Sequence, residues 1–388
     1  MNLPSSPGRL RLVALLALAL LPAGAGCRQG PWRLWNSYSA RFIDQEGRVI
    51  DPQGQGRTTS EGQSYALFFA LASDDRARFD RVLEWTQENL AQGDLNHHLP
   101  AWLWGKDKDG KWRTLDPNSA SDADLWLAYT LLEAGRLWNQ PGYDKMGRQL
   151  IAQIASHEVA DLTGFGPMLL PGPVGFQHGG TWTLNPSYLP MFLFERMAVV
   201  DPAGPWKKIA VGIPRLIREG SPKGYAMDWV SYVPGDGFAP SSQFPSTTAD
   251  PPMGSYDAIR VYLWVGMMND DDTARADILD ALPSMANYLA THDAPPEKVS
   301  SLGIPSDTEG NAGFSAAVIP YLKAIPGTGR AIAKQTVRLN SLKDSTSGMY
   351  GKDLTYYDQN LALFATGFLD GRFRFGSDGS LKVGWTRS

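Results

Sequence analysis

A single cysteine, Cys27, is present among the 388 residues of the chain. Without a second cysteine the chain can form neither an internal disulfide bond nor a thiolate metal cluster, so the stability of the fold must come from its core. Histidine is also scarce, and the five histidines show no His-Glu-x-x-His spacing. We therefore expect no catalytic metal and no other cofactor.

Neither sign of charge is in excess, because the formal net charge is -4 and acidic and basic residues are interspersed. The chain lacks the basic stripe that attracts nucleic acid, so nucleic acid is not an expected partner. After its N-terminal region it also lacks any apolar run long enough to span a bilayer, so no transmembrane segment is expected in the mature protein. No Pro/Gly/Ser-rich linker divides the chain, which favours a single domain over residues 27–388, expected to be a monomer.

The first residues have the features of an export signal. Arg9 and Arg11 precede the apolar run LVALLALALLPAGAG, which ends in small residues before Cys27. We predict that residues 1–26 are a signal peptide and that the mature protein is periplasmic or secreted. Cleavage at the Ala-x-Ala site is the favoured interpretation. The alternative is that GAGC is a degenerate lipoprotein box and that Cys27 carries a lipid.

Apolar residues recur three and four positions apart in most of the chain, which is typical of helices, whereas alternating strand patterns are scarce. Short joints, such as residues 72–75 and 139–143, favour antiparallel helix hairpins. Six successive hairpins can close into a double-layered ring whose long loops gather at one rim, where a site is then expected. The C-terminal stretch RFRFGSDGSLKVGW predicts a two-stranded hairpin on the outside of this ring. The expected helices lie near residues 32–43, 61–73, 76–91, 122–138, 143–157, 185–199, 204–218, 255–269, 273–290, 311–323, 327–340 and 355–369.

Three acidic residues stand at predicted helix starts. Glu61 lies in TTSEGQSYA, Asp122 lies in NSASDADLW, and Asp257 lies in SYDAIRVYLWVG. Ser60 and Gln63 resemble a capping box, which would place Glu61 in the first helical turn. If the three helices are inner ones that run the same way, their acids project into one groove. The alternative is that each acid only interacts favourably with a helix dipole.

Tryptophan is abundant, with 13 residues in the chain. Flat aromatic faces stack on the apolar faces of sugar rings, and two opposed carboxyl groups are the usual means of cleaving a glycosidic bond, so acids beside tryptophans suggest carbohydrate chemistry. Trp126, inside a predicted helix, is expected in the core. Arg260 is expected either to bind a sugar hydroxyl or to pair with Asp257. The candidate substrate-binding residues are Trp102, Trp104, Trp112, Asp124, Trp182, Tyr188, Trp229 and Arg260.

Four segments, TSEGQSYA, PAWLW, SASDADLWLAYTLLEAGRLW and SYDAIRVYLW, resemble glycoside hydrolase family 8. The resemblance runs from about residue 31 to residue 375, and its signature, A-[ST]-D-[AG]-D, is specific. It is closest to the periplasmic endoglucanases encoded with bacterial cellulose synthase. The resemblance implies an (α/α)6 barrel of six helical hairpins that forms a single catalytic domain. It also implies that this domain cleaves β-1,4-glucan internally, with inversion of the anomeric configuration.

The resemblance also implies a role for each acid. Glu61 matches the proton donor of the family. Asp122 matches the second catalytic acid of the signature, either a nucleophile or a residue that orients the sugar ring, and Asp257 matches the general base. The expected partners are a β-1,4-glucan chain and, as a candidate, the cellulose synthase complex.

Other functions remain open on the sequence alone. One is the hydrolysis of another polysaccharide, such as xylan, chitosan or mixed-linkage glucan. Another is glucan binding without catalysis, although binding alone would not require the three acids. Polysaccharide lyase chemistry would need grooves rich in arginine and lysine, which this sequence does not indicate.

Overall fold

The computed structural model describes Met1, residues 30–243 and residues 250–386. Apart from Met1, the predicted signal peptide of residues 1–26 lies outside the described residues, as does Cys27. Within the described part, no helix combines the length and the hydropathy needed to cross a membrane.

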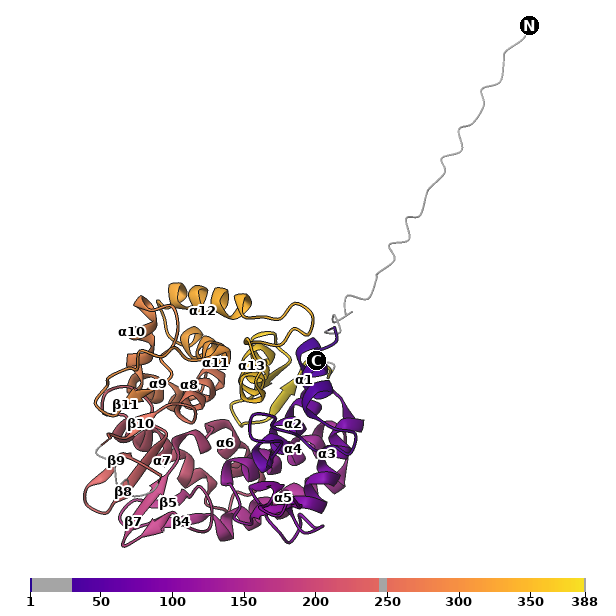
Figure 1. The fold of residues 1–388 in the computed structure, drawn as a ribbon, viewed down its shortest axis with the longest axis horizontal. Helices are drawn as coiled ribbons and strands as arrows, with labels where there is room; N and C mark the ends of the chain where they lie inside the picture. Colours follow the sequence, from indigo (N-terminus) through magenta and orange to yellow (C-terminus); the bar gives the residue numbers. More distant parts are fainter. Residues whose placement is uncertain (2–29, 244–249, 387–388) are drawn as a thin grey trace.

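Two layers of helices form a closed ring (Figure 1). The inner layer supplies most of the buried core and consists of α2 (Ser60–Ala72), α4 (Ser121–Leu137), α6 (Met191–Val200), α8 (Ala258–Met267), α11 (Ala312–Lys323) and α13 (Tyr356–Leu369). The outer layer consists of α1 (Arg33–Phe42), α3 (Arg76–Leu90), α5 (Pro141–His157), α7 (Trp206–Gly220), α9 (Thr273–Ala281), α10 (Pro283–Thr291) and α12 (Gly329–Ser341). The predicted (α/α)6 barrel is confirmed.

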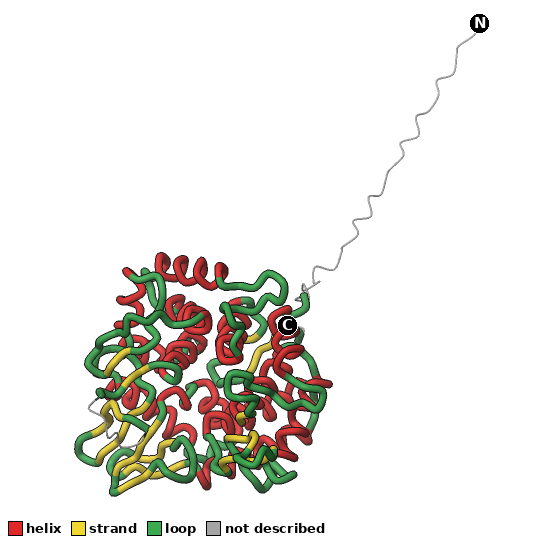
Figure 2. Tube along the Cα trace, in the orientation of Figure 1, coloured by secondary structure: helices red, strands yellow, loops and turns green. Residues whose placement is uncertain are grey.

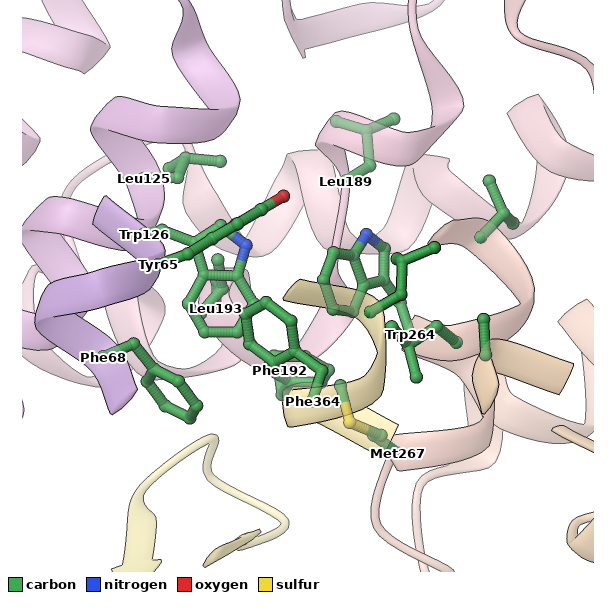
Figure 3. Close-up of a cluster of buried hydrophobic side chains, with 14 of the residues drawn as sticks. Tyr65, Phe68, Leu125, Trp126, Leu189, Phe192, Leu193, Trp264, Met267 and Phe364 are labelled. Atoms are coloured by element: carbon green, nitrogen blue, oxygen red, sulfur yellow. The ribbon is translucent and has the colours of Figure 1, made fainter. Parts of the chain in front are cut away.

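Aromatic side chains of the inner helices meet at the centre of the ring (Figure 3). The ring of Trp126 lies 5.0 Å from that of Phe364 and 5.4 Å from that of Trp264, centre to centre. The prediction that Trp126 belongs to the core is therefore confirmed. All residues of α8 are buried, which explains why the inner helices are apolar on every side.

Prolines shorten two of the predicted helices. The helix expected over residues 273–290 is divided into α9 and α10, because Pro283 has no N–H group to continue the first helix. The helix expected over residues 185–199 begins only at Met191, after a 3-10 turn at Pro186–Tyr188 and a second proline, Pro190.

The two ends of the chain close the ring. Helix α1 contacts α13, so the sixth hairpin is not formed by neighbouring segments as expected. The Ser37 hydroxyl donates to the carbonyl of Ser347 at 2.5 Å, and Arg33 donates to the carbonyl of Ser345 at 2.8 Å. Ring closure therefore depends on contacts between residues far apart in the sequence.

Strands are more numerous than the sequence indicated. The described residues form five small antiparallel sheets, drawn yellow in Figure 2. Every strand of the described residues has two to five residues, too few for an alternating pattern to be recognised. The sheets are β1 (Thr58–Thr59) with β2 (Leu103–Lys106) and β3 (Trp112–Asp116); β4 (Val159–Leu162) with β5 (Gly166–Leu169); β6 (Gln177–His178) with β7 (Thr181–Leu184), β8 (Trp229–Val233) and β9 (Gly237–Ser241); β10 (Met253–Gly254) with β11 (Val299–Ser300); and β12 (Phe373–Phe375) with β13 (Leu381–Val383).

The C-terminal hairpin is present as predicted, but its position on the outside of the ring was wrong. The ring of Phe375 stacks on that of Phe192 with centres 3.8 Å apart. The backbone N–H of Leu381 donates to Glu133 at 2.8 Å, and the Tyr129 hydroxyl donates to the carbonyl of Gly379 at 2.8 Å. The hairpin thus packs among inner helices, because its phenylalanines need an apolar environment.

Candidate active site

The three predicted acids stand at the starts of three inner helices. Glu61 lies in the first turn of α2, Asp122 lies in the first turn of α4, and Asp257 directly precedes α8. The predicted capping box is displaced by one residue, because the hydroxyl of Thr59 accepts from the N–H of Gly62 at 3.2 Å.

The guanidinium of Arg260 brings these acids together. One of its terminal nitrogens, Nη1, donates to Glu61 and, at 3.0 Å, to Asp122. The other, Nη2, donates to Asp257 at 2.7 Å. A planar guanidinium can contact several carboxylates at once, which a lysine ammonium on a flexible stem does less precisely. Three helices are thereby tied together at one rim of the ring.

The depth of these side chains separates them into two kinds. The side chains of Arg260 and Asp122 are 3% and 4% exposed, whereas those of Glu61 and Asp257 are 22% and 29% exposed. Glu61 and Asp257 therefore present the larger surfaces to a ligand, whereas Asp122 presents only a small part of its carboxyl group. The expectation that Arg260 binds a sugar hydroxyl is not supported, and the alternative ion pair with Asp257 is observed.

Burial controls the protonation of Asp122. It raises the pKa of this carboxyl to about 7, and the charges of Glu61 and Asp257 act in the same direction, while Arg260 acts against them. Asp122 therefore holds its proton through the mildly acidic range. Within the described residues, no group of His, Cys, Asp and Glu side chains is arranged to hold a metal ion.

Three residues that the sequence analysis did not select complete the site. The Tyr65 hydroxyl accepts from Arg260 at 3.0 Å and lies 3.3 Å from Glu61, to which it donates. The Asn185 amide donates to the second oxygen of Asp257 at 3.0 Å. Tyr65 could have been found from its position one turn after Glu61 on the same helix, whereas the sequence around Asn185 gave no such signal.

The third missed residue is Asp228, which fixes the backbone around Asp257. One of its oxygens accepts from the N–H of Ser255 at 2.7 Å and from that of Ala258 at 2.8 Å, so it caps the start of α8. Burial, followed by the charge of Asp257, raises the pKa of Asp228 to about 6. Its position directly before Trp229 was the only hint in the sequence.

A groove of about 930 Å³ lies next to the acids, which do not line it themselves; its wall includes Ala120, two residues before Asp122. Trp102, Tyr188 and Trp229 line it; that they bind substrate stays a prediction. The Trp102 carbonyl accepts from the N–H of Ser60, next to Glu61, at 3.1 Å, and the ring of Tyr188 lies 5.6 Å from the Arg260 guanidinium. Further along, the groove is lined by Phe176, Asn118, Ser119, Ala120, Gln153, His97, His98 and His157. Asp116 also lines it. Polar side chains between aromatic rings suit a hydroxyl-rich chain.

Three predicted platforms do not line this groove. Trp104 and Trp112 stack on each other with ring centres 5.0 Å apart, and Trp104 also packs against Trp85 of the outer helix α3. Trp182 is 4% exposed and packs against Tyr232 within its sheet. Trp104 and Trp112 lie in the paired strands β2 and β3, whose register is irregular between Leu103 and Trp104, and Trp182 lies in β7.

Asp124 is also misplaced as a substrate-binding candidate. Its side chain is fully buried and faces Glu158, not the groove. Since a side chain with no exposed surface cannot contact a sugar, the structure does not support that prediction.

The sequence and the fold both match known proteins. The family model for "Glycosyl hydrolases family 8" matches residues 5–370. An endoglucanase of Xanthomonas axonopodis pv. citri is 45% identical over 378 residues, which cover 96% of this chain and 94% of that protein. An endoglucanase of Escherichia coli K12 is 43% identical over 97% of both chains.

Solved structures of endoglucanases also resemble this fold. The crystal structure of an endo-1,4-D-glucanase from Vibrio fischeri ES114 matches with a TM-score of 0.82 and 38% identity, over 91% of this chain and 99% of that one. The endo-beta-1,4-glucanase CMCax from Acetobacter xylinum matches in fold, with a TM-score of 0.69 and 23% identity over 88% and 98% of the two chains. The chain is a glycoside hydrolase and belongs to glycosyl hydrolases family 8.

Proposed function

We propose that the protein is an endoglucanase that cleaves internal β-1,4 bonds of glucan with inversion. One observation carries the proposal: Arg260 holds two partly exposed acids, Glu61 and Asp257, beside a groove with aromatic walls. The names of the relatives, endoglucanase and endo-1,4-D-glucanase, support β-1,4-glucan as the substrate.

The reaction divides between the two exposed acids. Glu61 gives a proton to the glycosidic oxygen as the bond from this oxygen to the anomeric carbon breaks. Asp257 takes a proton from a water molecule, whose oxygen bonds to the anomeric carbon from the opposite face. The Asn185 amide, bound to one oxygen of Asp257, fixes the direction in which this base faces. No covalent sugar–enzyme intermediate is formed.

Asp122 acts from below the reacting bond. Because its pKa is raised to about 7, it is protonated in mildly acidic solution and can donate a hydrogen bond to a sugar hydroxyl. We assign it the orientation of the sugar ring at the cleavage point. This choice follows from its burial, since a nucleophile would need to reach the anomeric carbon.

We also propose that the protein is exported and acts on cellulose made by the same bacterium, with the synthase complex as a candidate partner. The basic residues and apolar run before Cys27 support export. N-terminal sequencing and mass measurement of protein from the periplasm and the medium should show loss of residues 1–26. Full-length protein confined to the cytoplasm would contradict export, and a lipid on Cys27 would contradict simple cleavage.

The variant Glu61→Gln should lose the release of reducing ends from soluble carboxymethylcellulose by about 10²- to 10⁴-fold, because glutamine has no acidic proton to give. Glu84→Gln makes the same chemical change on the exposed face of α3 and should retain native activity. Anomers of fresh product, followed by NMR, should be α first.

Three results would contradict this assignment. Native activity in the Glu61→Gln variant would show that Glu61 is not the proton donor. A β-anomer as first product would exclude inversion. Cleavage of xylan, chitosan or mixed-linkage glucan in place of cellulose derivatives would change the substrate but not the chemistry.

The variant Asp122→Asn should make the protein more stable at pH 8 while lowering activity. A carboxyl with a raised folded-state pKa contributes stability at low pH that is lost as the pH rises through about 7. Asparagine does not ionise, so the variant avoids this loss. Its free energy of unfolding should exceed that of the native protein by about 2 kcal/mol at pH 8 and by less at pH 5. Urea unfolding at both pH values measures it, and a destabilised variant at pH 8 would be the contrary result.

The variants Trp102→Ala and Trp229→Ala should each raise KM for soluble cello-oligosaccharides several-fold, because each removes an aromatic wall of the groove. Trp112→Ala is the matched control, since this ring is 42% exposed but does not line the groove. Steady-state kinetics of the three variants measure these KM values. An equal rise in KM for Trp112→Ala would mean that the chain also runs over the β2–β3 hairpin.

A further inference from the structure

Two further carboxyl groups are enclosed together behind Asp122. Asp124 lies in the same first turn of α4, and Glu158 directly follows α5. Both side chains are fully buried. They face each other within hydrogen-bond reach, and the Ser119 hydroxyl donates to Oε1 of Glu158 at 2.5 Å.

The pair is short of hydrogen-bond donors. Both oxygens of Asp124 and Oε2 of Glu158 are buried, and no N–H or hydroxyl group of the described residues donates to them. If both carboxyls were ionised, two negative charges would be in contact away from water and three acceptors would be unsatisfied, at a large cost in free energy. One shared proton supplies the missing donor and removes one of the charges.

The surroundings favour retention of this proton. Burial is the main cause that raises the pKa of Glu158 to about 8, and it raises the pKa of Asp124 well above its ordinary range. Asp122 is the other titratable group that the pair faces, and its negative charge, once it ionises, acts in the same direction. Ser119, the neutral neighbour, acts against them.

The pair also connects the segments that form one wall of the groove. Ser119 and Ala120 line the groove directly before α4. The N–H of Leu170 donates to the backbone carbonyl of Glu158 at 2.8 Å, and the N–H of Ser121 donates to the carbonyl of Pro171 at 3.0 Å. A displacement of Glu158 would therefore move the start of α4, which carries Asp122.

We propose that Asp124 and Glu158 share one proton and act as positioning residues that hold Asp122 and the adjoining groove wall in place. The inference deepens the proposed function and rests on it for the activity measurements alone. While the proton is present, the two acids form one hydrogen-bonded unit. Its loss at alkaline pH puts two negative charges in contact and displaces the start of α4, so that activity falls.

The variant Glu158→Gln tests the shared proton. Its amide donates to Asp124 and its carbonyl accepts from Ser119, with no proton to lose. In the native protein the unfolding free energy should fall as the pH rises from 5 to 9, because the folded pair keeps a proton that the unfolded chain releases. In the variant the slope against pH should be smaller by one proton near pH 7. Urea unfolding measures both slopes, and equal slopes would overturn the proposal.

Glu195→Gln is the matched control. Burial, together with Asp272, raises the pKa of Glu195 to about 8, and this residue lies on α6 outside the groove. In Glu195→Gln the slope of unfolding free energy against pH should therefore also be smaller by one proton. The pH dependence of kcat should be unchanged. A changed kcat profile in this control would show that the profile does not report on the Asp124–Glu158 pair, and would overturn the positioning role.

Activity tests the positioning role. The alkaline limb of kcat should move to higher pH in Glu158→Gln, whereas Glu158→Ala, which removes both hydrogen bonds, should lower kcat across the pH range with little change in KM. A folded Glu158→Ala protein with native kcat and a native pH profile would overturn this role. The native protein and all variants could prove inactive on glucan while the slope of unfolding free energy against pH is still smaller by one proton in Glu158→Gln. The proposed function would then fail, and the shared proton would stand.

Discussion

The contact between one guanidinium and three carboxyl groups is the interaction on which the site depends. Glu61, Asp122 and Asp257 are carboxyl groups from different helices, and whenever they are ionised together they would repel each other without Arg260. Loss of the Arg260 side of this contact would be expensive, because the carboxylates would be left without a counter-charge. The same contact fixes the relative positions of α2, α4 and α8. The arrangement of the three acids and of these three helix starts thus depends on a single side chain.

Much of the fold could be predicted from the sequence because its helices are long and strongly periodic, and because inner helices are apolar on all sides. The sites of Glu61, Asp122 and Asp257 followed from helix starts, and the family resemblance added their roles. Short strands could not be predicted, since two to five residues carry no readable alternation. The break at Pro283 could have been predicted, because proline rarely continues a helix that has already begun.

The tryptophans show where local sequence stops being informative. Trp102 and Trp104 are two residues apart in one loop, yet Trp102 lines the groove and Trp104 packs against an outer helix. Composition alone gives both the same chance of binding sugar. The difference arises from pairing of β2 with β1 and β3, with an irregular register at Leu103 and Trp104. Tertiary pairing of this kind is decided by residues distant in the sequence, as is the hydrogen bond from Asn185 to Asp257.

The closure of the ring by its own two ends has a consequence for how the molecule is assembled. Contacts such as those of Arg33 and Ser37 with the segment before α13 join residues more than 300 positions apart, so a large loss of chain entropy precedes them. Helix α13 also supplies Phe364 to the aromatic centre. A nascent chain that has not yet received α13 has an open ring with an incomplete centre. The aromatic centre beneath the acids is therefore complete only when α13, the last inner helix, has joined the ring.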